Sequence, residues 1–324
     1  MWLQTRMFLL IAVLFGILYG VITAVGMYMG VGNAVAYIIL ALFFLGLQYM
    51  ISPWLVGLTM HVKYVTETEE PELHHMVAEL ADRAHLPKPK VGISNLNVPN
   101  AFAFGRTQHD GRICFTRGIV NLLNRDELMA VAGHEMSHIK HRDMAVITLL
   151  SAIPMILYWV AFSLMWGGMG SQDRKGNSTY AVIIGISAFV LYFITNLLVL
   201  YGSRIREYYA DQGSVKLGNA PNYLATALYK LVHGEARMNK DSAEMKQVRA
   251  VKAFFVNDPA QAWNEVREIA QIDRNRDGVI DQNDLEDLRQ KHVRAGSGAT
   301  FAELFSTHPN MLKRMKHLST LVAG

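Results

Sequence analysis

The feature that most constrains this chain is the length of its uncharged stretches. No Asp, Glu, Lys or Arg occurs from residue 7 to residue 62, and two further uncharged stretches cover 144–172 and 176–203. A helix needs about 20 apolar residues to cross the hydrocarbon core of a bilayer. The alternative, buried helices of a soluble protein, is disfavoured because such helices rarely contain uncharged runs of this length. The sequence therefore predicts membrane-spanning helices.

The first stretch is long enough for two spans, near 7–30 and 34–58, with a tight turn at residues 30–33. Each later stretch holds one span, so we expect four transmembrane helices. An even number of spans places both polar parts of the chain on one side of the membrane, and the Lys and Arg distribution favours the cytoplasmic side. The expected organisation is a transmembrane hairpin over 1–60, a first polar segment over 61–143, a second transmembrane hairpin over 144–203 and a second polar segment over 204–324.

The polar segments predict a mainly α fold with a small antiparallel β-sheet. A helical pattern begins at Pro71, and Lys90–Asn95 has the pattern of a strand. Two more strands flank the pair Asp110-Gly111, which is a hairpin turn signal. A further helix is expected to begin near Arg125, because carboxylates occupy its first turn. The second polar segment is mostly helical in pattern.

The helix near Arg125 carries the run His134-Glu135-Met136-Ser137-His138. Two His at i and i+4 project from one helix face, so both imidazoles can bind one Zn²⁺. Glu135 stands beside them, where it can take a proton from a water that the metal acidifies and pass it to the leaving amine. The single Cys114 excludes a Cys-rich zinc site. A solvated helix face is the alternative interpretation of the His pair.

A zinc site requires at least a third protein ligand. A metzincin would have Gly at 141 and His at 144, whereas this chain has His141 and Met144. His141 is almost two turns from His134 and is expected on the surface or beside a ligand. Glu207 is the better candidate for the third ligand, because it directly follows the last span. Asp211 lies four positions later, on the same face of a helix. One carboxylate can bind the metal while the other orients a ligand or a basic side chain. An ordinary charged helix face is the alternative.

Together these residues resemble the M48 family of membrane metallopeptidases, and within it the HtpX-type proteases. The resemblance rests on His-Glu-x-x-His, on Glu-x-x-x-Asp after a transmembrane hairpin, on Asn100-Ala101-Phe102-Ala103, and on His308-Pro309 with Arg314 near the end. It implies a gluzincin-type catalytic domain attached to four transmembrane helices, with Glu207 as the third zinc ligand. It also implies that His308 and Arg314 lie near the substrate, with Arg314 held by Asp211.

Two of these segments have roles that can be argued physically. His308 can donate a hydrogen bond to the oxyanion of a tetrahedral intermediate; the alternative is a structural His before Pro309. The strand from Asn100 to Phe104 can pair with an extended substrate backbone, as edge strands do in β-augmentation.

A second metal-ligating pattern, over 273–284, departs from the HtpX-type pattern. It fits a calcium loop, with oxygen-bearing side chains at positions 1, 3, 5, 9 and 12 and Gly278 at position 6. Asp284 stands where a bidentate Glu is usual, as in dockerin-type loops, so Ca²⁺ should bind more weakly or Mg²⁺ should compete. A polar turn that binds nothing is the alternative. The candidate ligands are Asp273, Asn275, Asp277, Val279, Asp281 and Asp284.

The sequence thus predicts a zinc metalloendopeptidase of the cell membrane. It would hydrolyse membrane or misfolded proteins on the cytoplasmic side, in quality control and stress response. The expected partners are protein or peptide substrates and the lipid bilayer; the net charge of +4 comes from scattered residues, so no nucleic acid is expected. Two alternatives are a prenyl-protein peptidase of the Ste24 type, which has more spans, and a catalytically silent membrane protein that binds calcium.

Overall fold

The computed structural model describes residues 32–167, 177–237, 262–290 and 297–322, together with part of 6–21. The chain divides into two compact units, and each unit is assembled from two separate parts of the sequence. The first unit comprises Met1–Ile51 and Ala145–Ser203. The second unit comprises Ser52–Met144 and Arg204–Gly324.

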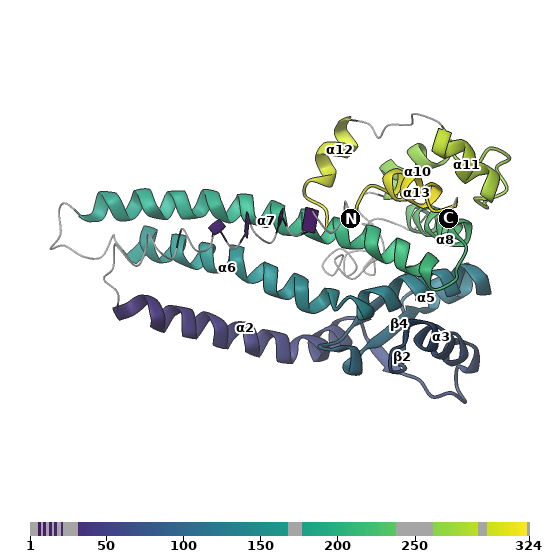
Figure 1. The fold of residues 1–324 in the computed structure, drawn as a ribbon, viewed down its shortest axis with the longest axis horizontal. Coiled ribbons are helices and arrows are strands. Elements are labelled where there is room, and N and C mark those ends of the chain that lie inside the picture. Colours follow the sequence, from purple (N-terminus) through teal and green to yellow (C-terminus); the bar gives the residue numbers. More distant parts are fainter. Residues whose placement is uncertain are drawn as a thin grey trace. The chain divides into compact units, whose positions relative to one another are not determined.

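Long apolar helices supply the first unit (Figure 1). They are α2 (Gly32–Thr59), α6 (Asp143–Gly167) and α7 (Asn177–Lys216). Each of the three helices extends into the second unit. Tyr158 of α6 contacts Tyr192 of α7, with ring centroids 5.6 Å apart. The two helices pack antiparallel, because Gly202, late in α7, faces Leu150, early in α6, and Gly185, early in α7, faces Met165, late in α6. Leu150, Ile153, Leu157 and Val199 form their shared apolar core.

Two helices in the described part of the chain are long and apolar enough to cross a membrane, over Asp143–Phe162 and Val182–Lys216. The sequence predicts four spans, and that number is not confirmed. Most of the span expected near 7–30 lies outside the described residues.

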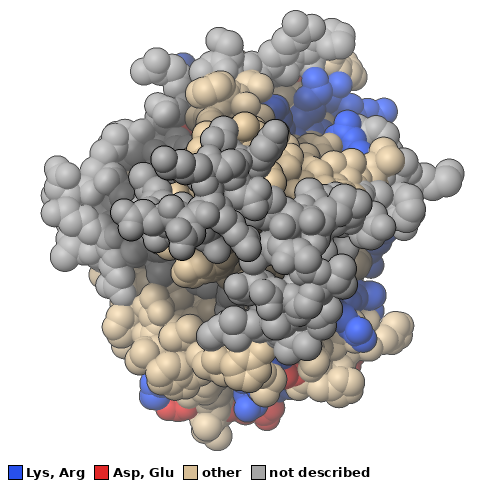
Figure 2. Space-filling view, turned by 90° about the vertical axis from the view of Figure 1, so that its left-hand side faces the viewer, with Lys and Arg blue, Asp and Glu red and all other residues tan. Residues whose placement is uncertain are grey.

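Large apolar side chains are exposed on the helices of the first unit. Figure 2 views the molecule from the left-hand side of Figure 1, and the charged side chains that it colours lie mainly along the right-hand and lower edges. An exposed apolar surface of this kind marks a membrane or protein interaction site. The exposed residues include Phe43, Met50, Trp159, Phe162, Ile183, Ile186, Val190 and Phe193.

The second unit contains a four-stranded sheet in the order β1-β2-β4-β3. The pairs β1/β2 and β3/β4 are antiparallel, but β2 and β4 are parallel, so the prediction of an antiparallel sheet is wrong. The turn signal at Asp110-Gly111 correctly indicated that β3 and β4 pair. It carried no information on which of them lies beside β2, and β4 takes that place, which leaves β3 at the edge. The strands are β1 (Val62–Tyr64), β2 (Lys90–Ser94), β3 (Ala101–Phe104) and β4 (Arg112–Thr116).

Helices surround this sheet and confirm the mainly helical fold. Side chains that alternate along the strands pack on one face against α3 (Pro71–Ala84) and α5 (Arg125–Lys140), as expected of a pleated sheet buried on both faces. The opposite face, with Phe102, Phe104 and Cys114, packs against Val56 and Met60. The other elements are η1 (Gln108–Asp110), α4 (Arg117–Leu122), α8 (Pro221–Ala236), α10 (Ala262–Ile269), α11 (Gln282–Gln290), α12 (Ser297–Glu303) and α13 (Met311–Ser319).

Candidate metal centre

Helix α5 carries the His pair, and its start is set by a capping box. The Asn124 side chain accepts a hydrogen bond from the Glu127 N–H at 2.9 Å, and the Glu127 carboxylate accepts one from the Asn124 N–H at 3.1 Å. Glu127 also forms an ion pair of 2.7 Å with Lys230 of α8. Because α5 contacts α3, α8 and the sheet, it is buried almost all round. The two His therefore project into the interior of the second unit.

Small residues allow α5 and the last turns of α7 to cross closely. A Cβ at Gly133 would lie 2.3 Å from the Asn219 side chain and 2.8 Å from the Ser214 hydroxyl. A Cβ at Gly213 would lie 2.0 Å from the Ser137 hydroxyl. Any larger side chain at either glycine would push the helices apart. The crossing therefore brings the buried face of α7 against the His pair of α5.

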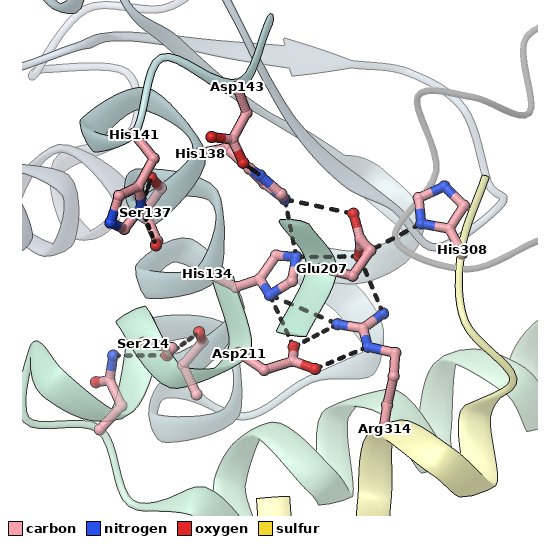
Figure 3. A network of polar contacts seen from close by, with 12 residues as sticks. His134, Ser137, His138, His141, Asp143, Glu207, Asp211, Ser214, His308 and Arg314 are labelled. Atoms are coloured by element: carbon pink, nitrogen blue, oxygen red, sulfur yellow. Dashed lines mark hydrogen bonds and ion pairs between the residues drawn. The ribbon is translucent and has the colours of Figure 1, made fainter. Parts of the chain in front are cut away.

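His134, His138 and Glu207 meet at this crossing (Figure 3). The two Nε2 atoms are 3.1 Å apart, and the Glu207 carboxylate oxygens lie 3.5 Å from His134 Nε2 and 3.6 Å from His138 Nε2. Ligands held at the zinc distances of proteins in a tetrahedral site are roughly 3.3 Å apart. Within the described ranges, this is the one group of three or more His, Cys, Asp or Glu donors that comes close enough to hold a metal.

The outer nitrogens of both imidazoles are bonded to carboxylates. His134 Nδ1 lies 2.9 Å from Asp211 Oδ1, and His138 Nδ1 lies 2.7 Å from Asp143 Oδ2. Since a carboxylate accepts, each Nδ1 must donate, which leaves the Nε2 lone pairs of the neutral rings directed at each other. Two facing lone pairs repel unless a cation lies between them. The donor set thus fits a metal ion such as Zn²⁺, which takes neutral imidazole and carboxylate ligands.

Charge in this buried region also favours a cation. Arg314, which is fully buried, donates to both oxygens of Asp211 at 2.6 and 3.0 Å. Arg206 forms an ion pair with Asp143. Arg314 Nη1 also lies 3.5 Å from Glu207 Oε2. The two guanidinium groups thus face three carboxylates, those of Asp211, Asp143 and Glu207, and a dication would offset the remaining negative charge. Buried charges without such compensation are costly.

The pKa values of His134 and Glu207 are also shifted in the directions that favour a cation at this site. Burial lowers the pKa of His134, but its hydrogen bonds with Asp211 and Glu207 outweigh burial and raise the pKa to about 9. Burial opposes ionisation of Glu207, but the positive charges of His308 and Arg314 and the His134 hydrogen bond hold its pKa well below the usual range. The carboxylates therefore stabilise positive charge at His134, which a bound metal ion would supply in place of a proton. Burial and the neighbouring His134 lower the pKa of His138, so that ring favours the neutral form that binds a metal.

Glu135 lies between the His pair and the edge of the sheet. It is 4% exposed, and its carboxylate accepts a hydrogen bond from the Ala103 N–H of β3. Burial raises the pKa of Glu135 above the ordinary value, although the neighbouring imidazoles oppose this. A carboxylate of raised pKa beside a metal site is well suited to take up and release a proton.

His308 lies on the other side of Glu207, with its Nδ1 3.3 Å from Glu207 Oε2 (Figure 3). Its buried Nε2 has no hydrogen-bond partner among the described residues. Arg204 of α7 holds the segment before His308, because its guanidinium donates to the carbonyls of Glu303 and Ser306, both at 2.8 Å. Arg204 thus holds the segment that carries His308 beside α7, although the two are more than ninety positions apart in the sequence.

Other predicted residues lie at varying distances from this group. Asn100 is buried just before β3, where its backbone N–H and carbonyl both bond Thr116. His141 is exposed at the end of α5, with Nδ1 2.9 Å from the Ser137 carbonyl, and does not belong to the donor group. The carboxylates of 273–284 are not gathered as a metal group either.

Asp143, Arg206 and Arg204 are functional candidates that sequence reasoning missed. Asp143 stands five positions after His138, beyond the end of α5, so helical periodicity did not flag it. Arg206 and Arg204 read as basic residues that flank a membrane span. A partial signal did exist, because Arg204, Glu207 and Asp211 recur at the spacing of one helix face.

Loss of the Asp143 carboxylate should weaken metal binding by the donor group. We expect Asp143→Ala to lower zinc affinity about 10- to 100-fold, because His138 loses the acceptor that orients its ring. Asp143→Asn, which keeps an acceptor oxygen, should lose less. Competition with a chromophoric chelator measures both affinities. If both variants bind zinc as tightly as the wild type, Asp143 does not position His138.

Comparison with known proteins agrees with this geometry. The model of peptidase family M48 matches residues 67–322. A protease HtpX homolog of Methanothermobacter thermautotrophicus is 54% identical over 230 residues, which cover 71% of this chain and 86% of that protein. Homologs from Pyrococcus furiosus and Moorella thermoacetica are 34% and 32% identical, each over 98% of this chain and 95% and 94% of their own lengths.

A solved structure shows a related fold. The crystal structure of S. mikatae Ste24p superposes with a TM-score of 0.52 at 17% identity, covering 97% of this chain and 65% of that chain. The present chain thus spans about two thirds of the length of that protein, and the likeness concerns the fold. From the family match and the near full-length relatives, the chain belongs to peptidase family M48, as an HtpX-type protease.

Proposed function

We propose that this chain is an integral membrane, zinc-dependent endopeptidase that cleaves membrane or misfolded proteins in quality control. The observation that carries the proposal is the pair of facing Nε2 atoms, 3.1 Å apart, with the Glu207 carboxylate beside both. His134, His138 and Glu207 would hold the zinc ion. Asp211 and Asp143 would orient the two imidazoles through their Nδ1 hydrogens.

Zinc in such a site supplies a Lewis acid that polarises the scissile carbonyl and acidifies water. Glu135 would take the proton from the attacking water on its carboxylate and later deliver it to the nitrogen of the leaving amine. Its burial and its bond from the Ala103 N–H support this role, because both fix the carboxylate beside the donor group.

His308 would stabilise the oxyanion that forms as the carbonyl is attacked. The contact of His308 Nδ1 with Glu207 and the unpartnered Nε2 support this, since Nε2–H remains available to donate. Arg314 would act through Asp211, by holding the carboxylate that orients His134. Removal of a single oxyanion donor typically lowers kcat about 10²- to 10³-fold.

The substrate would pair as an extended strand with β3. This strand is at the edge of the sheet, and its residue Ala103 donates to Glu135. A backbone added along β3 would therefore pass the general base. Asn100, at the start of the same strand, would contribute to this substrate path. Binding through the backbone suits a protease that accepts varied unfolded sequences.

The protein would be a multi-pass protein of the cytoplasmic membrane with its catalytic unit in the cytoplasm. The two apolar helices and the Lys and Arg distribution support this orientation. A cytoplasmic reporter fused after residue 324 should be active, and an exported reporter inserted near residue 174 should also be active. The reverse pattern would contradict the orientation.

Metal analysis of the purified full-length protein tests the proposed function directly. We expect about one zinc per chain and cleavage of an unfolded model protein such as casein, because the donor group has the three protein ligands of a catalytic zinc site. Treatment with a zinc chelator should abolish cleavage, and added Zn²⁺ should restore it. The catalytically silent alternative predicts no zinc and no cleavage, and that result would overturn the proposal.

A further inference from the structure

The segment between α10 and α11 contains the loop Asp273–Asp284, which the peptidase reaction does not use. Gly278, at position 6, has a φ of +81°, which glycine adopts without strain. The flanking α10 and α11 contribute Ile269, Leu285 and other buried side chains to the core of the second unit. We propose that this loop binds one Ca²⁺ ion.

Asp273 provides the observation that points to a cation. It is 3% exposed, and its Oδ2 accepts a hydrogen bond from the Gly278 N–H at 2.9 Å. This bond turns the carboxylate toward the interior of the loop. The Tyr229 hydroxyl of α8 interacts with the same carboxylate, but the other oxygen, Oδ1, is buried and has no donor within hydrogen-bond distance in the part of the chain that the structure describes. A buried carboxylate oxygen without a partner calls for a ligand, and position 1 of a calcium loop supplies one.

The carboxylates of the loop have no basic side chain as an ion-pair partner among the described residues. Among the described residues, no Lys, Arg or His lies within ion-pair distance of Asp273, Asp277, Asp281 or Asp284. Burial, and then the negative charges of Asp281 and Asp273, raise the pKa of Asp284. The Tyr229 hydroxyl of α8 is hydrogen-bonded to the Asp273 carboxylate, and burial and this bond raise the pKa of Tyr229 to about 12. A cation among these carboxylates would relieve their mutual repulsion.

The loop is anchored to the rest of the second unit through one backbone position. Ile280 is fully buried, its N–H donates to the Thr226 hydroxyl at 2.9 Å, and its carbonyl accepts from the same hydroxyl at 3.0 Å. Thr226 belongs to α8, so one side chain satisfies both backbone groups of the loop. The loop is thereby docked on α8.

The ligand set consists of hard oxygen donors, which suit Ca²⁺ rather than Zn²⁺. Asp277 now accepts hydrogen bonds from Asn275 Nδ2 and the Val279 N–H, both at 2.8 Å. In this structure the loop carboxylates are not drawn together around one point, and Asp281 and Asp284 accept hydrogen bonds from each other's N–H groups. Ion binding would draw the ligands together and exchange the Asn275 bond for coordination, since Asn275 and Asp277 are exposed and can turn. The ligands would be Asp273, Asn275, Asp277, Asp281 and Asp284, with the carbonyl of Val279.

Binding should stabilise the helices on both sides of the loop. The α10 residue Glu265 accepts a hydrogen bond from the Met311 N–H at the start of α13, at 3.0 Å. Helix α11 also contacts α13, and α13 carries Arg314. An ion in the loop would therefore tie down the elements that support α13.

Calorimetric titration of Ca²⁺ into the full-length, zinc-loaded Glu135→Gln protein in detergent tests the proposal. This background prevents self-cleavage. We expect one site with a Kd between about 10⁻⁵ and 10⁻³ M, because Asp284 replaces the bidentate Glu of tighter loops. The melting temperature should rise when Ca²⁺ is added. Asp273→Asn and Asp277→Asn should each lower the affinity about tenfold or more, since each removes a ligand charge.

Asp287→Asn is the matched control. Asp287 lies on α11 and pairs with Arg274, outside the ligand set, so this variant should bind Ca²⁺ as the parent does. Asp277→Asn keeps the test decisive even if the buried Asp273→Asn variant misfolds, because Asp277 is exposed. No Ca²⁺ binding up to millimolar concentration would overturn the proposal. Equal binding by all variants, or tighter binding of Mg²⁺ than of Ca²⁺, would also overturn it.

Discussion

Replacement of Glu135 by Gln should abolish peptide-bond hydrolysis while the protein keeps its zinc. Gln has nearly the same shape and retains an oxygen that can accept the Ala103 N–H, but its amide cannot take a proton from water. Proton transfer by a positioned side chain typically contributes 10²- to 10⁴-fold to a rate. We therefore expect cleavage of an unfolded protein to fall by at least about 10²-fold.

Zinc content and melting temperature serve as the measurements that separate chemistry from folding. Both should equal those of the wild type, because Glu135 is not one of the three candidate ligands. Glu127→Gln is a matched control on the same helix. It can still cap α5 but loses its charge pairing with Lys230, so it should reduce stability and leave cleavage per folded molecule nearly unchanged. Full activity of Glu135→Gln would exclude Glu135 as the general base.

Replacement of Glu207 by Gln should remove the zinc as well as the activity. The Glu207 carboxylate supplies the only negative charge among the three candidate ligands of the described residues. Its pKa is held well below the usual range, against the effect of burial, so it is ionised at neutral pH. Loss of a residue that only orients a ligand typically lowers metal affinity roughly 10- to 100-fold. Replacement of the ligand carboxylate itself by an uncharged amide should lower zinc affinity by more than that.

Metal content after dialysis against a weak chelator measures this effect. Glu303→Gln offers a matched control, because Glu303 is also a buried carboxylate of the second unit but pairs with Lys313. It should retain stoichiometric zinc. If Glu207→Gln also retains stoichiometric zinc with unchanged affinity, Glu207 is not a ligand, and the proposed ligand set is wrong.

The mainly helical fold and the central part of the site were predictable because they depend on local patterns. The spacing of His134 and His138 places both on one helix face wherever that helix packs. The acidic first turn indicated the start of α5 near Arg125, and the structure places that start at Arg125. The count of four spans and the residue roles stay predictions.

Contacts between distant segments could not be predicted in the same way. Asp143 and Arg206 are separated by two apolar helices in sequence, yet they form an ion pair behind His138. The error in the sheet has the same origin, because the turn signal fixed the pairing of β3 with β4 but not the strand beside β2.

By itself, the sequence determined the apolar helices, the His pair and the family, since all three follow from periodicity and motif spacing along short segments. Only the tertiary structure decided how the donor group is completed. That depends on the close crossing of α5 and α7 at Gly133 and Gly213, where the absence of side chains lets the helices approach. Close packing of this kind is a property of two surfaces together, and neither segment alone encodes it.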